Sequence, residues 1–488
     1  MKVTDIIQTE NQGDVIQEMK SHRFIPQPDV EAAKKVLDPQ EHDINSPIIR
    51  PDKRVKVTDD TQGESAQKVI DVDGKDNGNF RYEKVARIAV ALQNLIINRA
   101  VSFVFGNEPA YNSTPDNDNQ KLVKRAFDRI LYDAKSRSLN RKIARFIFGF
   151  KECAELWYPM EVKEPHGNYG FKTKFKLRCA LFSPALGDTL YPYFDETGDM
   201  VAFSRSFARK DDSGNATDFF ETYTDEEHCL WANGANGFEM VEGYPKPVAI
   251  GKIPIIFGHQ DKFETQDVDK LIGRLEKLLS NFADTNDYHA SPKIFTTGQI
   301  NGWSKKGEAG AVIEGEEGAT MQYVSWQSAP ESVKLEIETL LKMIYTITQT
   351  PDISFDSVKG IGAVSGIALK LLFMDAHLKV QDKREIFDDY LQRRVNVIKA
   401  YICKFNEGLK TDCDSLLIEP EIVPYMIVDE KEQVEYWMTA NGNKALISQE
   451  ESVEKAGLTS NAEATMEKIN NESSRDNSFV IGEPIIEA

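Results

Sequence analysis

The sequence predicts an α+β protein in which helical blocks and a β-rich region follow one another. Three observations support this fold class. The 41 residues from Ile367 to Glu407 contain no Gly or Pro, which is typical of one long helix. From Cys153 to His259, short aromatic and β-branched runs alternate with turn residues, which is typical of antiparallel strands. Two helices with narrow apolar faces bracket a Gly-containing insert at Lys293–Trp326.

The bulk composition restricts the class of protein. A length of 488 residues suggests two to four domains. The net charge of -19 excludes a repressor-like DNA-binding protein, because such proteins neutralise phosphates with a basic surface. Five cysteines without CxxC spacing predict a reducing compartment. No apolar run approaches membrane length and the first residues lack a signal-peptide core, so we expect no membrane partner.

The first half of the chain begins with a segment of low periodicity. Residues 1–80 predict a partly flexible N-terminal segment, and Asp71–Gly78 resembles a calcium loop. Lys75 and Asp76 occupy the fifth and sixth positions of that loop, where an oxygen ligand and Gly are needed, so we expect a solvated loop. Helices are predicted, before the β-rich region, over 82–105, 118–131 and 140–148.

The second half contains the two bracketing helices. They are predicted from Glu264 to Tyr288 and from Pro330 to Thr348, with apolar residues at near-heptad spacing. Together with the strand-and-turn insert between them they predict a helix hairpin with a small head. Thr350-Pro351 then breaks the chain and a glycine-bearing loop follows.

The long helix is expected to begin at Ile367. Its first half is apolar almost all around, which predicts burial on more than one side, whereas its second half has a single stripe. The polar patch Lys379–Glu385 separates the halves, so we expect the surroundings to change there. Beyond it, the sequence predicts a strand over 415–418, acidic helices from Val428 to about Asn470, and a tail from Asn471.

Several signals of enzyme or cofactor chemistry are weak. Gly360, Gly362 and Gly366 have the wrong spacing for a dinucleotide fingerprint and follow a helix. The sequence has no P-loop or GxSxG string, and its seven histidines lack metal-ligand spacing. Asp284–Asp287 and Asp388-Asp389 predict solvated or inter-subunit charges. We expect no cofactor, no metal site and no catalytic residues.

Four strings, in this order, resemble the portal proteins of tailed bacteriophages, specifically the compact siphophage type. They are Lys252–Ile256 (KIPII), Leu279–Tyr288 (LSNFADTNDY), Thr350–Phe355 (TPDISF) and Ser365–Lys370 (SGIALK). The resemblance covers most of the chain from about Tyr82 to Asn470. It implies a portal-type fold, assembled as a ring, typically of twelve copies, at one capsid vertex. Residues 1–80 match no portal element.

The resemblance also implies a role for each segment. The assignments are a wing (82–263), a first stem helix (264–291), a β-rich clip (292–329), a second stem helix (330–349), a tunnel loop (350–366), a long tunnel helix with a return to the wing (367–427), a helical crown (428–470) and a tail (471–488).

Two groups of residues are implied as functional. The tunnel loop would line a DNA channel with Asp352, Ser354, Lys359, Gly360, Ile361, Gly362 and Gly366. Lys359 either meets phosphate or is a solvated lysine, and the glycines would allow the loop to change shape. The clip would face partners with Trp303, Lys305, Lys306 and Trp326, although Trp residues are also used as the core of small β domains.

The implied function is a non-enzymatic channel for double-stranded DNA during packaging and ejection. Implied partners are further copies of the chain, the large terminase subunit, scaffolding and major capsid proteins, and head-completion or adaptor proteins. The implied location is the virion, after assembly in the host bacterial cytoplasm. Two alternatives stay open: a non-viral oligomeric scaffold or adaptor, and a metal-independent hydrolase or transferase with a site in the β-rich region.

Overall fold

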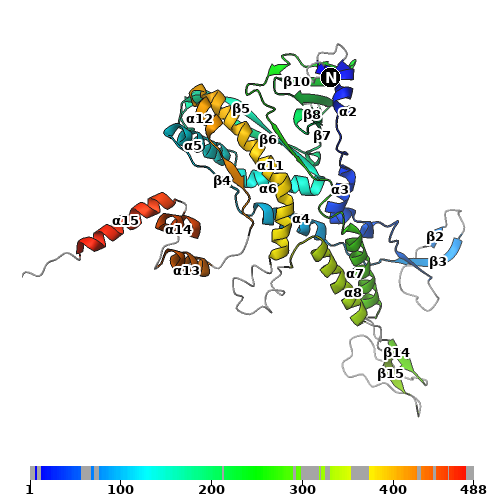
Figure 1. Ribbon diagram of the computed structural model, residues 1–488. Coiled ribbons are helices and arrows are strands. Elements are labelled where there is room, and N and C mark those ends of the chain that lie inside the picture. The colour runs from blue at the N-terminus through cyan, green and yellow to red at the C-terminus, as the bar shows by residue number, and fades with distance from the viewer. Residues whose placement is uncertain are drawn as a thin grey trace, which may run out of the picture. The chain divides into compact units, whose positions relative to one another are not determined.

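The computed structural model mixes helices and strands in two compact units, which confirms the α+β class (Figure 1). One unit contains residues 1–351 and 375–424, and the other contains residues 352–374 and 425–488. The structure describes residues 6–7, 12–56, 68–70, 76–210, 214–289, 293–297, 318, 320–324, 330–352, 373–425, 430–442, 447–459 and 461–479.

The β-rich region of the first unit forms two antiparallel sheets. The larger has the order β11-β10-β9-β8-β7 with β12 on β10, and the smaller has the order β13-β5-β6. The strands are β5 (Glu152–His166), β6 (Thr173–Phe182), β7 (Thr189–Phe194), β8 (Met200–Lys210), β9 (Ala216–Tyr223), β10 (Glu227–Gly234), β11 (Gly237–Met240), β12 (Lys246–Pro247) and β13 (Ile255–His259), with a 3-10 turn, η4 (Pro184–Leu186). Alternating apolar residues of both sheets share one core, which includes Leu156, Phe203 and Ile255. The predicted β-rich region is confirmed.

Three helices pack beside these sheets: α4 (Leu92–Phe105), α5 (Asp118–Asp133) and α6 (Ser136–Phe150). Asn117 caps α5 by accepting a hydrogen bond from the Gln120 amide. These helices confirm two of the three predictions for this part. The third is wrong in its first half, because residues 82–83 end strand β3 (Asp76–Glu83) and residues 84–91 are extended.

The N-terminal segment contains elements that the sequence did not predict. Helix α2 (Gln12–Ser21) packs Val15, Ile16 and Met19 into a cluster with Phe220 and Trp231 of the larger sheet. Further elements are α3 (Val30–Leu37), η1 (Pro39–Glu41), η2 (Asp43–Asn45), and a small sheet of β1 (Lys53–Lys56), β3 and β2 (Lys68–Ile70). Asp76–Gly78 lie in β3 rather than in a loop, because β3 pairs with both β1 and β2. Residues 71–75 lie outside the described residues.

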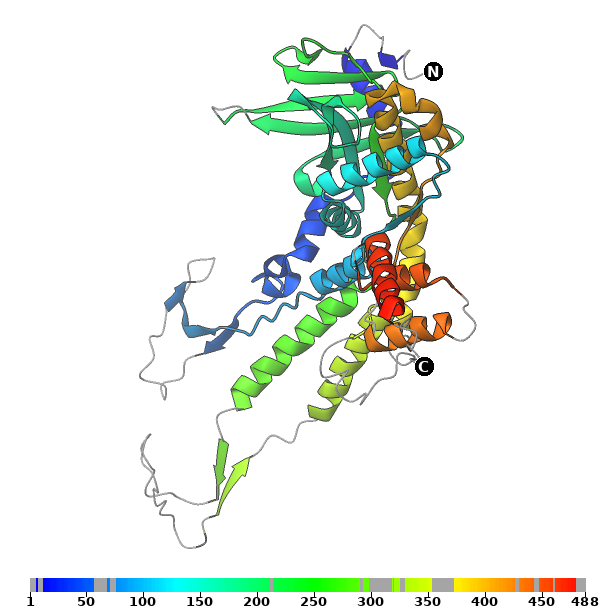
Figure 2. The same cartoon turned by 90° about the vertical axis from the view of Figure 1, so that its left-hand side faces the viewer.

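The two bracketing helices form an antiparallel hairpin (Figure 2). They are α7 (Asp269–His289) and α8 (Pro330–Ile347), and the strands β14 (Lys293–Thr296) and β15 (Met321–Val324) pair beyond their ends. Residues 264–268 form turns, so α7 begins later than the predicted Glu264. The predicted hairpin and the outer strands of its head are confirmed.

The long helix α11 (Met374–Phe405) has 32 residues, which is about 48 Å at 1.5 Å per residue. Phe373 is a turn residue directly before it, and residues 367–372 lie outside the described residues, so the described helix begins later than Ile367. The second-half stripe is buried as predicted. In the first half, however, Met374 and Leu378 are exposed, because one chain covers only one side of this part of the helix.

The remaining elements follow α11. They are η5 (Glu407–Leu409), α12 (Lys410–Ser415) and β16 (Glu419–Glu421), which pairs with β4 (Ala110–Asn112). The strand predicted over 415–418 is wrong. Leu416 and Ile418 are buried while Leu417 is exposed, so the apolar alternation reflects burial without strand pairing.

The second unit contains α13 (Glu430–Asn441), α14 (Gln449–Ala456) and α15 (Ala462–Phe479). Ser448 and Glu451 form a capping box at the start of α14. The predicted helical character is confirmed, but α15 continues past Asn470, where the sequence predicted the start of a tail.

Gly258 in β13 gives a test of how closely α11 packs on the smaller sheet. A Cβ at this position would lie 2.8 Å from Tyr390 Cδ2 and 3.1 Å from Ile147 Cδ1. Gly258→Ala should therefore lower the free energy of unfolding by about 1–3 kcal/mol, because the core is overpacked. Gly273→Ala on the exposed face of α7 meets no atom within 4 Å and should raise it by roughly 0.5–1 kcal/mol. Denaturant unfolding measures both, and equal effects of the two variants would contradict this packing.

Candidate channel and docking elements

Most residues predicted to line a channel or face partners lie outside the described residues. This group comprises Ser354, Lys359, Gly360, Ile361, Gly362, Gly366, Trp303, Lys305, Lys306 and Trp326. Asp352 is described and is half-buried, directly after the chain leaves α8. The structure therefore gives the elements that flank these segments: the hairpin of α7 and α8, the exit from α8 and the start of α11.

The hairpin of α7 and α8 has an apolar seam along its length. Val268, Ile272 and Leu275 on the α7 side contact Leu340 and Ile344 of α8 in one buried cluster. Ile96 of α4 belongs to the same cluster, so the seam continues into the base of the hairpin. These residues recur at three and four positions, as the sequence predicted.

A row of apolar side chains on α8 is not covered by α7. Leu335, Met343 and Ile347 are 65%, 44% and 48% exposed. Met343 and Ile347 are four residues apart and share one face of the helix, and Leu335, eight residues before Met343, is turned by about 80° from it. On the α7 side of the hairpin, Ile48 and Ile49 in the turn after η2 are also exposed. The hairpin thus has two different exposed apolar surfaces.

The extended segment 84–91 lies along α7 and is held by its side chains. The amides of Ala86, Ile88 and Val90 donate to Asp284 Oδ1, Ser280 Oγ and Glu276 Oε1 at 2.7, 2.9 and 2.9 Å. Alternate amides of an extended chain face the same side, and residues four apart share one helix face. These three amides of the segment are therefore hydrogen-bonded although the segment has no sheet partner.

The N-terminal segment is attached to the same face of α7. His42 Nδ1 lies 2.6 Å from Glu276 Oε1, and both side chains are buried. Arg50 Nη2 pairs with Asp284 Oδ2 at 2.8 Å, and its Nη1 donates to Asn281 Oδ1 at 2.8 Å. Asp284 therefore accepts hydrogen bonds from Arg50 and the Ala86 amide of the same chain. This corrects the prediction that Asp284 is solvated or inter-subunit.

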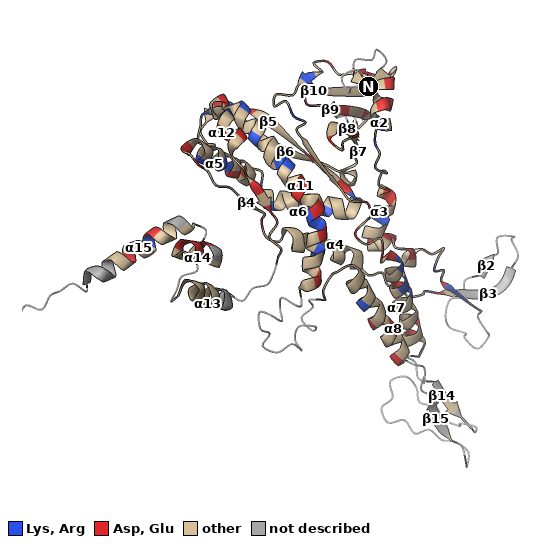
Figure 3. Cartoon of the chain, in the orientation of Figure 1, with Lys and Arg blue, Asp and Glu red and all other residues tan. Residues whose placement is uncertain are grey.

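Helix α11 is fixed to the smaller sheet by a fully buried ion pair. Arg394 Nε and Nη2 donate to the two oxygens of Glu155, each at 2.7 Å, and Nη1 donates to Asn140 Oδ1 at 2.6 Å. Both charged side chains are 0% exposed. Burial would lower the pKa of Arg394, but the charge of Glu155 outweighs it and raises that pKa. Acidic and basic residues are interspersed along α11 up to Asp389, and the charged residues that follow are basic (Figure 3).

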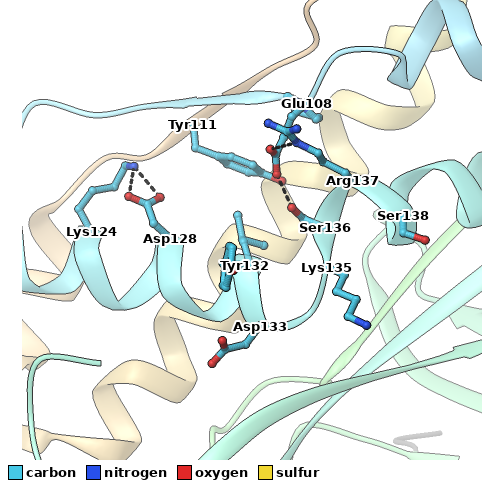
Figure 4. A pocket seen from close by; sticks show the side chains of 12 residues that line it. Glu108, Tyr111, Lys124, Asp128, Tyr132, Asp133, Lys135, Ser136, Arg137 and Ser138 are labelled. Carbon is cyan, nitrogen blue, oxygen red and sulfur yellow. Dashed lines mark hydrogen bonds and ion pairs between the residues drawn. The ribbon is translucent and has the colours of Figure 1, made fainter. Parts of the chain in front are cut away.

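An open groove of about 1010 Å³ lies beside the turn between α5 and α6 (Figure 4). Its charged side chains mostly pair with one another. Lys124 pairs with Asp128 at 2.7 Å, and Arg137 pairs with Glu108 at 2.7 Å, while Ser136 also donates to Glu108. The charge of the groove is therefore largely neutralised within the chain.

The enzyme alternative places a site in the β-rich region, where Glu221 forms a charge cluster. Arg205 Nε donates to Glu221 Oε1, and His228 Nε2 lies 3.3 Å from Glu221 Oε2. Burial would raise the pKa of Glu221, but the hydrogen bond of His228 and the charge of Arg205 outweigh it and lower that pKa. The carboxylate is thus held ionised and links β8, β9 and β10. Its lowered pKa makes it a weaker base than an ordinary glutamate.

Within the ranges that the structure describes, no group of three or more His, Cys, Asp or Glu side chains is placed to hold a metal ion. Among the same residues, no helix combines the length and hydropathy that crossing a membrane requires.

Comparison with known proteins identifies the family. The profile of the family described as "Phage portal protein, SPP1 Gp6-like" matches residues 43–478. No curated protein matches the sequence. A solved chain from the "Neck of empty GTA particle computed with C6 symmetry" aligns over 75% of this chain and 89% of that chain, with a TM-score of 0.38 and 10% identity. At that TM-score the likeness adds nothing to the family match.

The family match covers nearly the whole chain, including both helices of the hairpin, α11 and the helices of the second unit. Portal proteins are structural components of the capsid vertex, so the match replaces the non-viral scaffold alternative with a portal or connector role. Residues 12–42, with α2 and α3, are described but precede the matched range, whereas residues 43–80 belong to it, so the expectation that residues 1–80 match no portal element is wrong for 43–80. The chain belongs to the phage portal protein family, SPP1 Gp6-like.

Proposed function

We propose that copies of this chain form a closed ring of twelve around a channel for double-stranded DNA at one capsid vertex. DNA enters through the channel during packaging and leaves through it during ejection. The family match over residues 43–478 is the observation that carries this proposal. The ring also serves as the docking platform for the large terminase subunit and the head-completion or adaptor proteins, and it contacts scaffolding and major capsid proteins.

The exposed apolar surfaces of the hairpin support ring formation. Contacts around a ring are head-to-tail, so each copy needs two different contact surfaces. The row Leu335, Met343 and Ile347 on α8, and the pair Ile48 and Ile49 beside α7, are such unlike surfaces. Covering them with a neighbour removes apolar area from water, which favours association. The exposed Met374 and Leu378 at the start of α11 suit the same arrangement.

Within the proposed ring, each segment has the role that the family resemblance implied. The tunnel loop (350–366) lines the channel with Asp352, Ser354, Lys359, Gly360, Ile361, Gly362 and Gly366, and Lys359 contacts phosphate. The clip (292–329) presents Trp303, Lys305, Lys306 and Trp326 to the motor and later to the adaptors. The net charge of -19 lets DNA slide without adhering, since like charges repel.

Gly362→Pro tests the channel role of the tunnel loop. Proline fixes φ and removes an amide donor, so it should stiffen the loop. We expect the variant to form rings that package less DNA per particle than the wild type. Gly362→Ala keeps the amide and restricts only the backbone angles that glycine allows, so as the matched control it should lose less DNA content than Gly362→Pro. Packaged DNA is quantified in purified particles, and wild-type DNA content in Gly362→Pro would contradict the tunnel-loop assignment.

A further inference from the structure

We propose that Lys379 is a positioning residue, which holds the end of α8 and the start of α11 to one buried point at the base of the stem. The inference rests on the proposed function in one respect: the segment between these two ends contains the predicted tunnel loop. Its geometric part stands on described residues alone. Lys379 belongs to the polar patch at which the sequence predicts a change of surroundings. Its side chain is nevertheless buried and only 4% exposed.

The amine of Lys379 contacts three separate groups. Nζ lies 2.6 Å from Glu264 Oε1, 2.8 Å from the Thr348 carbonyl and 3.5 Å from Thr350 Oγ1. A lysine ammonium has three N–H donors and no acceptor, so each donor has a partner. These partners belong to the turns before α7, the C-terminal end of α8 and the chain directly beyond α8. A positive charge at the C-terminal end of a helix is also favoured by the helix dipole.

Glu264 is shared by a second lysine. Lys383, one turn further along α11, lies 2.6 Å from Glu264 Oε2 and donates to Gln260 Oε1 at 3.2 Å. Burial would raise the pKa of Glu264, but the charges of Lys379 and Lys383 outweigh it and lower that pKa. The carboxylate is therefore ionised and holds two successive turns of α11.

The chain directly after α8 is also held by hydrogen bonds that do not involve Lys379. The Thr350 amide donates to the Tyr345 carbonyl at 2.9 Å, and Thr350 is fully buried. Arg99 Nη1 of α4 donates to the Pro351 carbonyl at 2.9 Å. The division of the chain into compact units falls after residue 351 and after residue 374.

Lys379→Met tests this role, because it keeps the length of the side chain and removes all three donors. Lys262→Met is the matched control, since Lys262 lies at the same junction but pairs with Asp267 in solvent. Hydrogen exchange of the amides at 344–350 in the full-length protein should rise roughly tenfold in Lys379→Met and stay unchanged in Lys262→Met. Unchanged exchange in soluble Lys379→Met would overturn the proposal. If that variant is insoluble, Lys379→Gln, which keeps a polar head, should show a smaller increase in hydrogen exchange. Unchanged exchange in Lys379→Gln would then overturn the proposal.

A packaging assay separates positioning from simple stabilisation. Rings of Lys379→Met should package less DNA than rings of Lys262→Met at a temperature where both remain assembled, and Lys379→Arg should restore part of the loss. Wild-type packaging by Lys379→Met would overturn the positioning role while leaving the channel proposal intact, provided that Gly362→Pro is defective. Wild-type packaging by Gly362→Pro would instead contradict the tunnel loop, and hydrogen exchange would still decide whether Lys379 is the anchor.

Discussion

Replacing Arg394 with alanine should lower the free energy of unfolding by about 3–5 kcal/mol, because it leaves a buried charge without a partner. Glu155 is 0% exposed and receives both of its charged hydrogen bonds from Arg394. The substitution also removes the donor to Asn140 Oδ1. These contacts connect α11 with α6 and β5, so the loss should affect cooperative unfolding of the whole first unit.

Arg384→Ala is the matched control for this experiment. Arg384 lies on the same helix and pairs with Asp388 at 3.2 Å, but both side chains are partly exposed. Such a pair contributes only about 0–1 kcal/mol. The double variant Arg394→Met with Glu155→Leu removes both buried charges and should recover most of the stability. Denaturant unfolding at one protein concentration measures all three, and equal losses for Arg394→Ala and Arg384→Ala would contradict the buried link.

Replacing Glu276 with leucine should lower the free energy of unfolding by about 2–4 kcal/mol, because two buried donors lose their acceptor. Glu276 Oε1 lies 2.6 Å from His42 Nδ1 and accepts from the Val90 amide at 2.9 Å. The substitution therefore removes one of the contacts that hold the N-terminal segment to α7 and one of those that hold residues 84–91 to it.

Two further variants make this result specific. Glu276→Gln keeps an acceptor oxygen and should lose less stability than Glu276→Leu. Glu336→Leu removes an exposed carboxylate that pairs with Arg274 on the same hairpin and should change stability by less than about 1 kcal/mol. Proteolysis should also cut residues 43–52 faster in Glu276→Leu. Unchanged stability and cleavage in that variant would show that the segment is held to α7 by other contacts.

Periodicity was sufficient to predict the elements whose neighbours lie close in sequence or whose faces are regular. The stripes of α7 and α8 pack on each other, and the alternating runs of the β-rich region form antiparallel sheets. In both cases the buried face repeats with the period of the backbone. The narrow seam of the hairpin could therefore be predicted to the residue.

Elements held by distant polar partners could not be predicted in this way. Residues 84–91 have an apolar composition that suits a helix, but they are extended because side chains of α7, far along the chain, accept their amide hydrogens. Helix α2 is short and is stabilised mainly by the sheet face around Trp231. Tertiary contacts of this kind override local propensity, and one sequence does not reveal them.

The same limit applies to the functional elements. The glycine-bearing loop and the clip were predicted from local strings and the family resemblance. The anchor joins Lys379 to Glu264, which lies more than a hundred positions earlier, and to Thr348, which lies 31 positions earlier. Lysine in a polar run is normally solvated. The only sequence signal for the anchor was the Gly- and Pro-free run that places Lys379 and Lys383 one turn apart on a helix.

The native mass of the purified full-length chain tests the central claim most directly. Twelve copies of a 55.1 kDa chain have a mass of about 660 kDa, and a particle near that mass with an open centre in end-on images is the expected result. A chain that stays monomeric or dimeric at every concentration, with no particle that has a central opening, would contradict the account.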